Sequence, residues 1–181
     1  TPNVGANSLN DHDIAVERVR ALAVTNDIVI VSFHAGAEGD GAERLPFDRE
    51  YYVGEDRGDV VYFARAMVDA GADLLLGHGP HVPRAMELYR DRLIAYSLGN
   101  FATYYGIGVE GNRGIAPILT ARLDADGHFR SGHIDSTIQV RPDGPSIDPQ
   151  ARALALIREL TTSAYPDGAL EIRADGEMAQ R

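Results

Sequence analysis

The sequence has 181 residues, of which 44% are hydrophobic and 24% charged; these proportions exclude a disordered or collagen-like chain and favour one folded domain. Cysteine and lysine are both absent, which excludes disulfides, thiolate metal sites and catalysis by a lysine amine. With 27 acidic against 17 basic residues and a formal net charge of −10, the composition argues against a nucleic-acid partner.

The first part of the chain alternates helices with short apolar strands. After a loop at residues 1–10, capping signals and apolar spacing predict a helix at 11–24, a strand at 28–33, a helix at 57–71 and strands at 74–77 and 93–98. The strand at 28–33 is apolar at nearly every position, as in strands buried on both faces of a parallel sheet. This alternation is typical of the α/β class.

The second part of the chain predicts a hairpin followed by a helix. Strands are expected at 115–123 and 129–140, on either side of an Asp-Gly turn. A proline-rich stretch then leads to a helix of about 149–164 and a weakly patterned tail. We therefore expect a main domain at 1–141, followed by a C-terminal helix and tail at 142–181.

Residues 35–56 form a long connection between the first strand and the second helix. The segment is rich in glycine and mixed charge, and it carries the aromatic residues Phe47, Tyr51 and Tyr52. Connections of this length are uncommon in compact domains without a functional role. We therefore expect this loop to take part in function.

Polar residues follow three of the expected strands, at the edge where α/β sheets bind ligands. His34 follows the first strand; imidazole is a frequent metal ligand, although a lone histidine can equally be a buried side chain with satisfied hydrogen bonds. The segment 77–81, Gly-His-Gly-Pro-His, follows the second strand. Core packing hardly explains two histidines in such a turn, so we expect them to have a function. The alternative is a turn in which two histidines are merely exposed. Asn100 follows the third strand, where Gly-Asn is also ordinary turn chemistry.

These motifs occur in the order in which one known family carries them, at 32–38, 71–82 and 94–101. Over residues 10–140 the chain resembles the CapA family of poly-γ-glutamate capsule biosynthesis proteins, which are similar to calcineurin-like metallophosphoesterases. The resemblance implies an α/β fold, the C-terminal part of a metallophosphoesterase-like αββα sandwich. It also implies a site for divalent metal at the strand ends.

The resemblance further implies a role for each candidate residue. The metal ligands would be His34, His78 and His81, and Glu38 and Asn100 match family positions that we take as catalytic. The loop at 35–56 would cover the substrate with Arg44, Arg49, Tyr51 and Tyr52, its arginines recognising carboxylate or phosphate. The ion would be Mn, Fe, Zn or Mg.

The chain also departs from the family pattern. The N-terminal half of the family carries a Gly-Asp strand end, a Glu and an Asn-Asn-His motif that supply further ligands, and none of these occurs in this sequence. We therefore expect a C-terminal portion with an incomplete site that holds at most one ion. We also expect weak binding and little hydrolysis from this portion alone.

Two functions from different classes follow from the resemblance. The first is a metal-dependent hydrolase or transferase in capsule biosynthesis, acting on an anionic polymer or a phosphoester. The alternative is a non-catalytic assembly or scaffold component that works with other capsule synthesis and export proteins. Either function implies a bacterial cell envelope or extracytoplasmic location, with attachment through an N-terminal segment outside this chain; a cytoplasmic location stays open.

Overall fold

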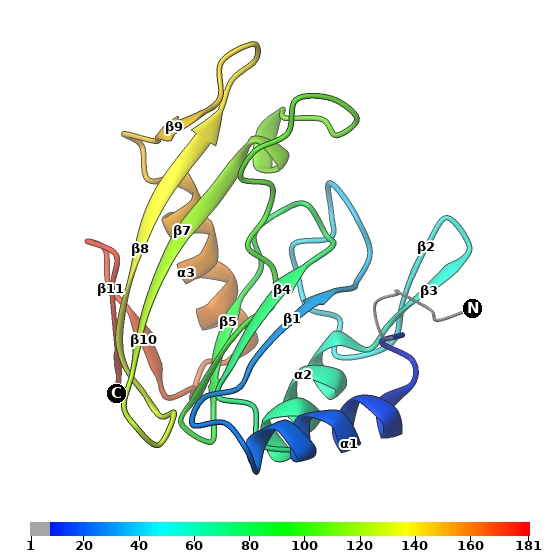
Figure 1. The fold of residues 1–181 in the computed structure, drawn as a ribbon. Coiled ribbons are helices and arrows are strands. Elements are labelled where there is room, and N and C mark those ends of the chain that lie inside the picture. The colour runs from blue at the N-terminus through cyan, green and yellow to red at the C-terminus, as the bar shows by residue number, and fades with distance from the viewer. Residues whose placement is uncertain (1–7) are drawn as a thin grey trace.

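The computed structural model describes residues 8–181, which fold into a layered α/β sandwich (Figure 1). Helices α1 (His12–Ala23) and α2 (Val60–Asp69) cover one face of a four-stranded sheet, and a five-stranded sheet packs toward its other face. This confirms the α/β class, whereas most of the loop expected at 1–10 lies outside the described residues. None of the helices described is long and apolar enough to cross a membrane.

The four-stranded sheet has the order β1-β4-β6-β5. Its members are β1 (Ile30–His34), β4 (Leu74–His78), β6 (Arg92–Ala95) and β5 (Met86–Tyr89). Strands β1, β4 and β6 run parallel, and β5 joins β6 as an antiparallel hairpin. The three strands are confirmed, but β1 is not buried on both faces as expected, because Phe33 is its only buried residue and Ile30 is 55% exposed. The parallel direction brings the carboxyl ends of the strands to one edge of the sheet.

Strand β5 is not expected from the sequence, and its turn explains why. The hairpin between β5 and β6 turns at Arg90 and Asp91, which both have positive φ angles, 49° and 61°. Two-residue turns with positive φ angles usually contain Asn-Gly or Asp-Gly. Here neither position is glycine, so the sequence carries no turn signal.

The second sheet is built on the expected long hairpin. Strands β7 (Ile115–Leu123) and β8 (Phe129–Gln139) pair antiparallel, and a single turn of 3-10 helix, η1 (Gly111–Gly114), precedes β7. Strand β9 (Pro145–Ile147) pairs with one end of β8. Strands β10 (Leu170–Ile172) and β11 (Glu177–Gln180), which the weakly patterned tail did not predict, extend the sheet on the other side of β8.

Residues 142–181 pack against both sheets. Helix α3 (Arg152–Ala164) contacts β7, β8 and β5, and Met178 of β11 is fully buried in the core between the sheets. The backbone N–H of Met86 also donates to the Thr161 hydroxyl at 3.0 Å, which joins β5 to α3. The helix and tail expected at 142–181 therefore share their core with the preceding elements.

The long connection expected at 35–56 contains a hairpin at its end. Strands β2 (Glu50–Tyr52) and β3 (Glu55–Gly58) pair antiparallel and project from the sandwich (Figure 1). The following helix begins at Val60 instead of near residue 57, because the Asp59 carboxylate caps it by accepting from the Tyr62 N–H at 2.9 Å. Residues 35–49 remain without regular secondary structure.

A buried ion pair anchors this irregular segment. Arg84 is fully buried, and its guanidinium makes two hydrogen bonds, of 2.8 and 2.7 Å, to the carboxylate of Glu50. The same guanidinium donates to the Ala42 carbonyl at 2.6 Å, and Glu50 also accepts from the Ala37 N–H at 2.9 Å. The pair thus joins the segment 37–50 to the residues that lead from the turn at 77–81 into β5.

Removal of one partner of this pair leaves the other charge buried and unpaired. We expect Arg84→Met to lower the free energy of unfolding by about 3–5 kcal/mol, measured by urea denaturation. Arg44→Met is the matched control, because Arg44 makes an exposed pair with Glu159 that is worth at most about 1 kcal/mol. Equal losses in the two variants would contradict the anchoring role of Arg84.

Candidate metal centre

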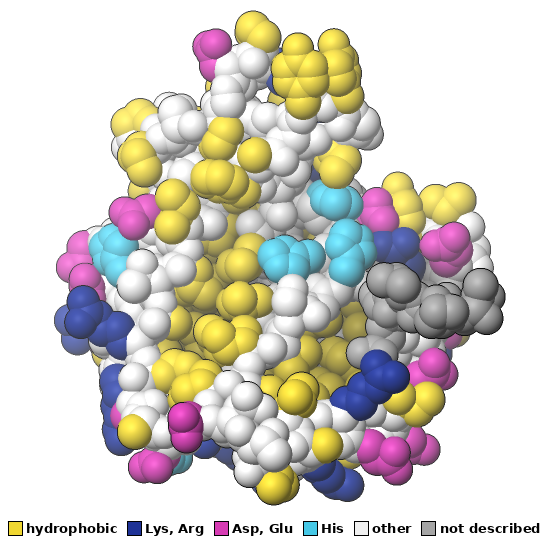
Figure 2. Space-filling view, viewed as in Figure 1, with side chains coloured by type: hydrophobic (Ala, Val, Ile, Leu, Met, Phe, Trp, Pro, Cys, Tyr) yellow, Lys and Arg dark blue, Asp and Glu magenta, His cyan; other side chains and the backbone are white. Residues whose placement is uncertain are grey.

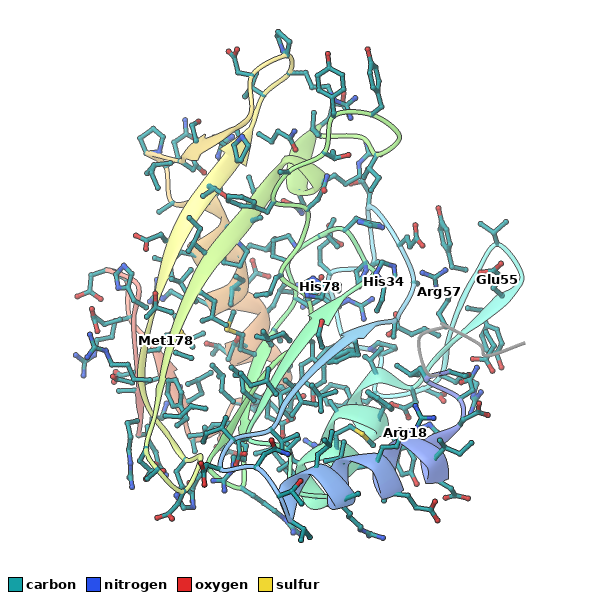
Figure 3. All side chains as sticks on the ribbon, in the orientation of Figure 1. Arg18, His34, Glu55, Arg57, His78 and Met178 are labelled. Atoms are coloured by element: carbon teal, nitrogen blue, oxygen red, sulfur yellow. The ribbon has the colours of Figure 1, made fainter. Side chains whose placement is uncertain are left out.

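The candidate centre lies where β1 and β4 end side by side. His34 and His78 are the last residues of these strands and occupy the same register position. Directly beyond them, the Ala35 N–H donates to the His78 carbonyl at 2.8 Å, which extends the pairing past the sheet. Figure 3 shows both histidine side chains at the tips of the two strands, and Figure 2 shows histidine side chains close together near the middle of the face viewed.

The turn after β4 needs its glycines because the backbones approach closely. A Cβ on Gly77 would collide with the Tyr96 carbonyl of the neighbouring chain segment. Gly79 has φ 123°, and a Cβ there would collide with the backbone of Ala35. This close approach packs the turn directly against the end of β1, which an alanine or larger residue would prevent.

The turn also reverses the chain so that His81 faces His34. His81 adopts a left-handed conformation, with φ 57°, which is uncommon for a residue with a side chain. The two imidazole rings lie 5.7 Å apart, centroid to centroid, in an edge-to-face arrangement. The backbone of this turn is held by the Gly39 N–H, which donates to the Pro80 carbonyl at 2.9 Å.

Glu38 completes a group of three possible ligands. One ligand atom from each of His34, Glu38 and His81 lies within 4.8 Å of the other two. The Glu38 carboxylate is oriented by Arg57, which donates to it at 2.7 Å, and it lies 3.9 Å from Nε2 of His81. Two imidazole nitrogens and a carboxylate oxygen at this spacing form a donor set suited to Zn, Mn or Fe.

His78 stands beside this group but outside it. Its burial, together with the neighbouring His34, lowers its pKa below the ordinary value of 6.5. Burial likewise lowers the pKa of His81, although Glu38 acts in the opposite direction. Both imidazoles are therefore neutral at pH 7, which is the form that binds metal.

Arg57 and Glu50 belong to the surroundings of the site but were not singled out from the sequence. Arg57 lies on β3 and, with His34, Glu38 and Asp56, lines a pocket of about 370 Å³ (Figure 3). In a loop of mixed charge, the sequence does not show which arginine will face the site. Arg84 does carry a signal, because a lone arginine inside the apolar stretch 82–86 indicates a buried, paired charge.

The remaining candidate residues do not lie in the cluster of His34, Glu38 and His81. Arg44 pairs with Glu159 of α3 at 3.0 Å, and Arg49 pairs with Asp56. Tyr51 and Tyr52 are exposed on the β2–β3 hairpin. Asn100 is buried and its amide donates to the Arg113 carbonyl of η1 at 3.4 Å. Their roles in catalysis and substrate binding stay predictions.

A second group of possible ligands in the described residues has a structural explanation. Asp124, Asp126 and His128 lie together in the turn between β7 and β8. The Asp124 carboxylate accepts from the backbone N–H groups of Asp126 and His128, and from the Arg130 guanidinium. These hydrogen bonds form the turn itself, so the group needs no ion to explain it.

The lowered pKa values of His78 and His81 make a prediction about pH. In the window below 6.5 the unfolded chain binds more protons than the folded one, so the free energy of unfolding rises with pH there. We expect imidazole resonances of both residues to titrate below 6.5 in NMR spectra. His78→Gln should reduce the difference in stability between pH 5 and pH 7; titration above 6.5 would contradict the burial.

The close approach of the turn to β1 makes a second prediction. Gly79→Ala combines a positive φ with a backbone collision, and we expect it to lower the free energy of unfolding by about 2–3 kcal/mol. Gly144→Ala is the control, since no atom lies within 4 Å of the added Cβ and the φ is not positive. Similar denaturation midpoints for both variants would show that the approach is not tight.

Comparison with known proteins identifies the family of this chain. The model of the bacterial capsule synthesis protein PGA_cap family matches residues 2–105. The PGA biosynthesis protein CapA of Bacillus subtilis is 40% identical over 91 residues, which cover 50% of this chain and 20% of that protein. The capsule biosynthesis protein CapA of Bacillus anthracis is 41% identical over 75 residues, 41% of this chain and 15% of that one.

A third relative comes from another genus. A probable polyglutamine synthesis accessory protein of Mycobacterium tuberculosis is 40% identical over 97 residues, 53% of this chain and 22% of that protein. The matched region thus spans about a fifth of the length of these relatives. Because the family model covers more than half of the chain and includes the His34, Glu38 and His81 positions, this chain belongs to the bacterial capsule synthesis protein PGA_cap family.

Proposed function

We propose that this chain provides part of a divalent-metal centre in a protein that acts on poly-γ-glutamate or a related anionic capsule polymer. The observation that carries the proposal is the meeting of His34, Glu38 and His81 at the ends of two parallel strands. The reaction class is metal-assisted hydrolysis or transfer at a phosphoryl or amide-type linkage. A bound ion would supply polarisation of that linkage and acidification of a water molecule.

The surrounding residues support this role through orientation. Arg57 holds the Glu38 carboxylate in place, and its side chain is mostly buried, as is that of Glu38, so solvent screens the pair less than it would screen an exposed one. The buried pair of Arg84 and Glu50 fixes the segment that carries Glu38. Burial lowers the pKa of His81, so this imidazole needs no proton removal before it binds a metal near pH 7.

We further propose that residues beyond these 181 complete the centre. Among the described strands, β1 pairs with β4 alone, so one long side of β1 is open and its backbone groups can pair with a further strand. A groove of about 780 Å³ runs along this side, lined by Val31, Phe33 and Met67 and reaching His34 and His78. Figure 2 shows this apolar surface below the histidines. A parallel strand added there would end beside His34.

The alternative proposal is a non-catalytic component that assembles with other capsule synthesis and export proteins. Two imidazoles and one carboxylate are few ligands for a two-metal catalyst, which supports a binding role. The description of one relative as a synthesis accessory protein points in the same direction. In both proposals the protein works at the bacterial cell envelope.

Metal titration tests the proposed centre directly. We expect calorimetry with Zn²⁺ or Mn²⁺ to show at most one weakly bound ion per chain, removed by EDTA. His34→Ala and His81→Ala should each weaken binding at least tenfold, because each deletes a ligand. His133→Ala, at a partly exposed histidine between Asp135 and Glu177, is the control and should leave binding unchanged.

Two results would contradict the proposal. Two tightly bound ions per chain would show that the centre is complete without further residues. Unchanged binding in the His34 and His81 variants would show that the ion sits elsewhere. A further measurement separates catalyst from scaffold. If a longer protein that includes this region cleaves the capsule polymer and a chelator stops the cleavage, the catalyst is favoured.

A further inference from the structure

A second pocket lies apart from the histidines, between the loop after β6 and the end of β8. It has a volume of about 370 Å³ and is lined by residues 102–105 on one side and by Gln139 and residues 141–145 on the other. These segments lie at the end of the β7–β8 hairpin remote from its turn (Figure 1). Nothing in the proposed metal centre uses this pocket.

A buried glutamine holds the two walls together. The Gln139 side chain is 5% exposed; its oxygen accepts from the Thr103 N–H at 3.0 Å and its amide donates to the Thr103 carbonyl. The Thr103 hydroxyl donates to the Tyr105 carbonyl at 3.0 Å, and Arg141 donates to the Ile107 carbonyl. The wall that carries the tyrosines is thus tied to β8 by side-chain hydrogen bonds, which forms the pocket before any ligand arrives.

Two aromatic rings beside this pocket are exposed to solvent. Tyr104 and Tyr105 are 74% and 78% exposed, and their rings meet edge to face at 4.6 Å. Phe101 and Val140 are also exposed nearby in the chain. Exposed aromatic rings in contact beside a pocket are suited to binding a ligand, and tyrosine adds a hydroxyl that can donate to an anion.

Arg141 gives the pocket a free positive charge. Arginines elsewhere, such as Arg44, Arg113 and Arg130, pair with carboxylates. Within residues 8–181, no carboxylate forms an ion pair with Arg141, whose described partner is a backbone carbonyl. A guanidinium without a carboxylate partner, next to exposed aromatic rings, is suited to a carboxylate on an extended ligand.

We propose that this pocket binds one segment of a polyamide chain that carries a carboxylate on each residue. Arg141 takes a carboxylate, the tyrosine rings pack against the methylene groups between charges, and their hydroxyls donate to amide carbonyls or carboxylates. The choice of a polyanion rests on the proposed function, whereas the pocket consists of different residues from the metal centre. Asp143 lines the same pocket and opposes the ligand, which makes it a test residue.

Binding of fluorescein-labelled γ-linked glutamate oligomers, followed by anisotropy with the full chain, tests the proposal. Arg141→Gln should weaken binding about tenfold, and Asp143→Asn should strengthen it. Arg122→Gln is the matched control, because Arg122 is also exposed and lies near the opposite end of the same hairpin. It removes the same charge and should leave affinity unchanged.

Further binding measurements test which ligand the pocket prefers and whether binding depends on the metal centre. The double substitution of Tyr104 and Tyr105 by alanine should also weaken binding several-fold, with unchanged circular dichroism. An α-linked glutamate oligomer that binds as well would assign the pocket to acidic peptides in general, and tighter binding of a neutral glucan would overturn the proposal. The proposal would also be overturned if Arg141→Gln bound the oligomer with an affinity within twofold of that of the unsubstituted chain. Oligomer binding at Arg141 should be the same with and without EDTA, so failure of the metal centre is recognised separately.

Discussion

A single buried ion pair holds together the two segments that carry the candidate metal centre. Arg84 lies three residues after His81, while Glu50 receives the N–H of Ala37, next to Glu38. Burial of two charges is costly, and here the cost is offset because the guanidinium and the carboxylate satisfy each other and nearby backbone groups. The ligands come from a strand end and two irregular segments, and the ion pair, together with the hydrogen bond from the Gly39 N–H to the Pro80 carbonyl, holds these segments together.

The sequence predicts those parts of the fold whose signals are local. Continuous apolar runs mark β1, β4 and β6, and an Asp-Gly turn marks the β7–β8 hairpin, so these elements are confirmed within a few residues. Strands β5, β10 and β11 are short, and their register comes from partners far along the chain. Their residues alternate too briefly for periodicity to identify them, and packing against neighbouring strands decides their conformation instead.

The same distinction holds at the site. The histidines could be predicted because His34 and His78 come at the ends of apolar runs, and the glycines around His78 indicate a close backbone approach that the structure confirms. The charged residues could not be assigned in this way. Arg57 meets Glu38 across 19 positions and Arg44 meets Glu159 across 115, separations that leave no pattern in the chain. Which arginine faces a ligand is decided by tertiary contacts that composition does not encode.

The backbone at His81 has a further consequence for how this position is selected. A left-handed conformation costs a residue with a Cβ about 1–2 kcal/mol relative to glycine, so stability alone would favour glycine there. Glycine would satisfy the turn and remove the imidazole. The chain instead keeps a side chain that its own backbone disfavours, and it does so where that ring meets His34 and Glu38. An unfavourable backbone conformation is therefore kept at the residue whose imidazole completes the group of possible ligands.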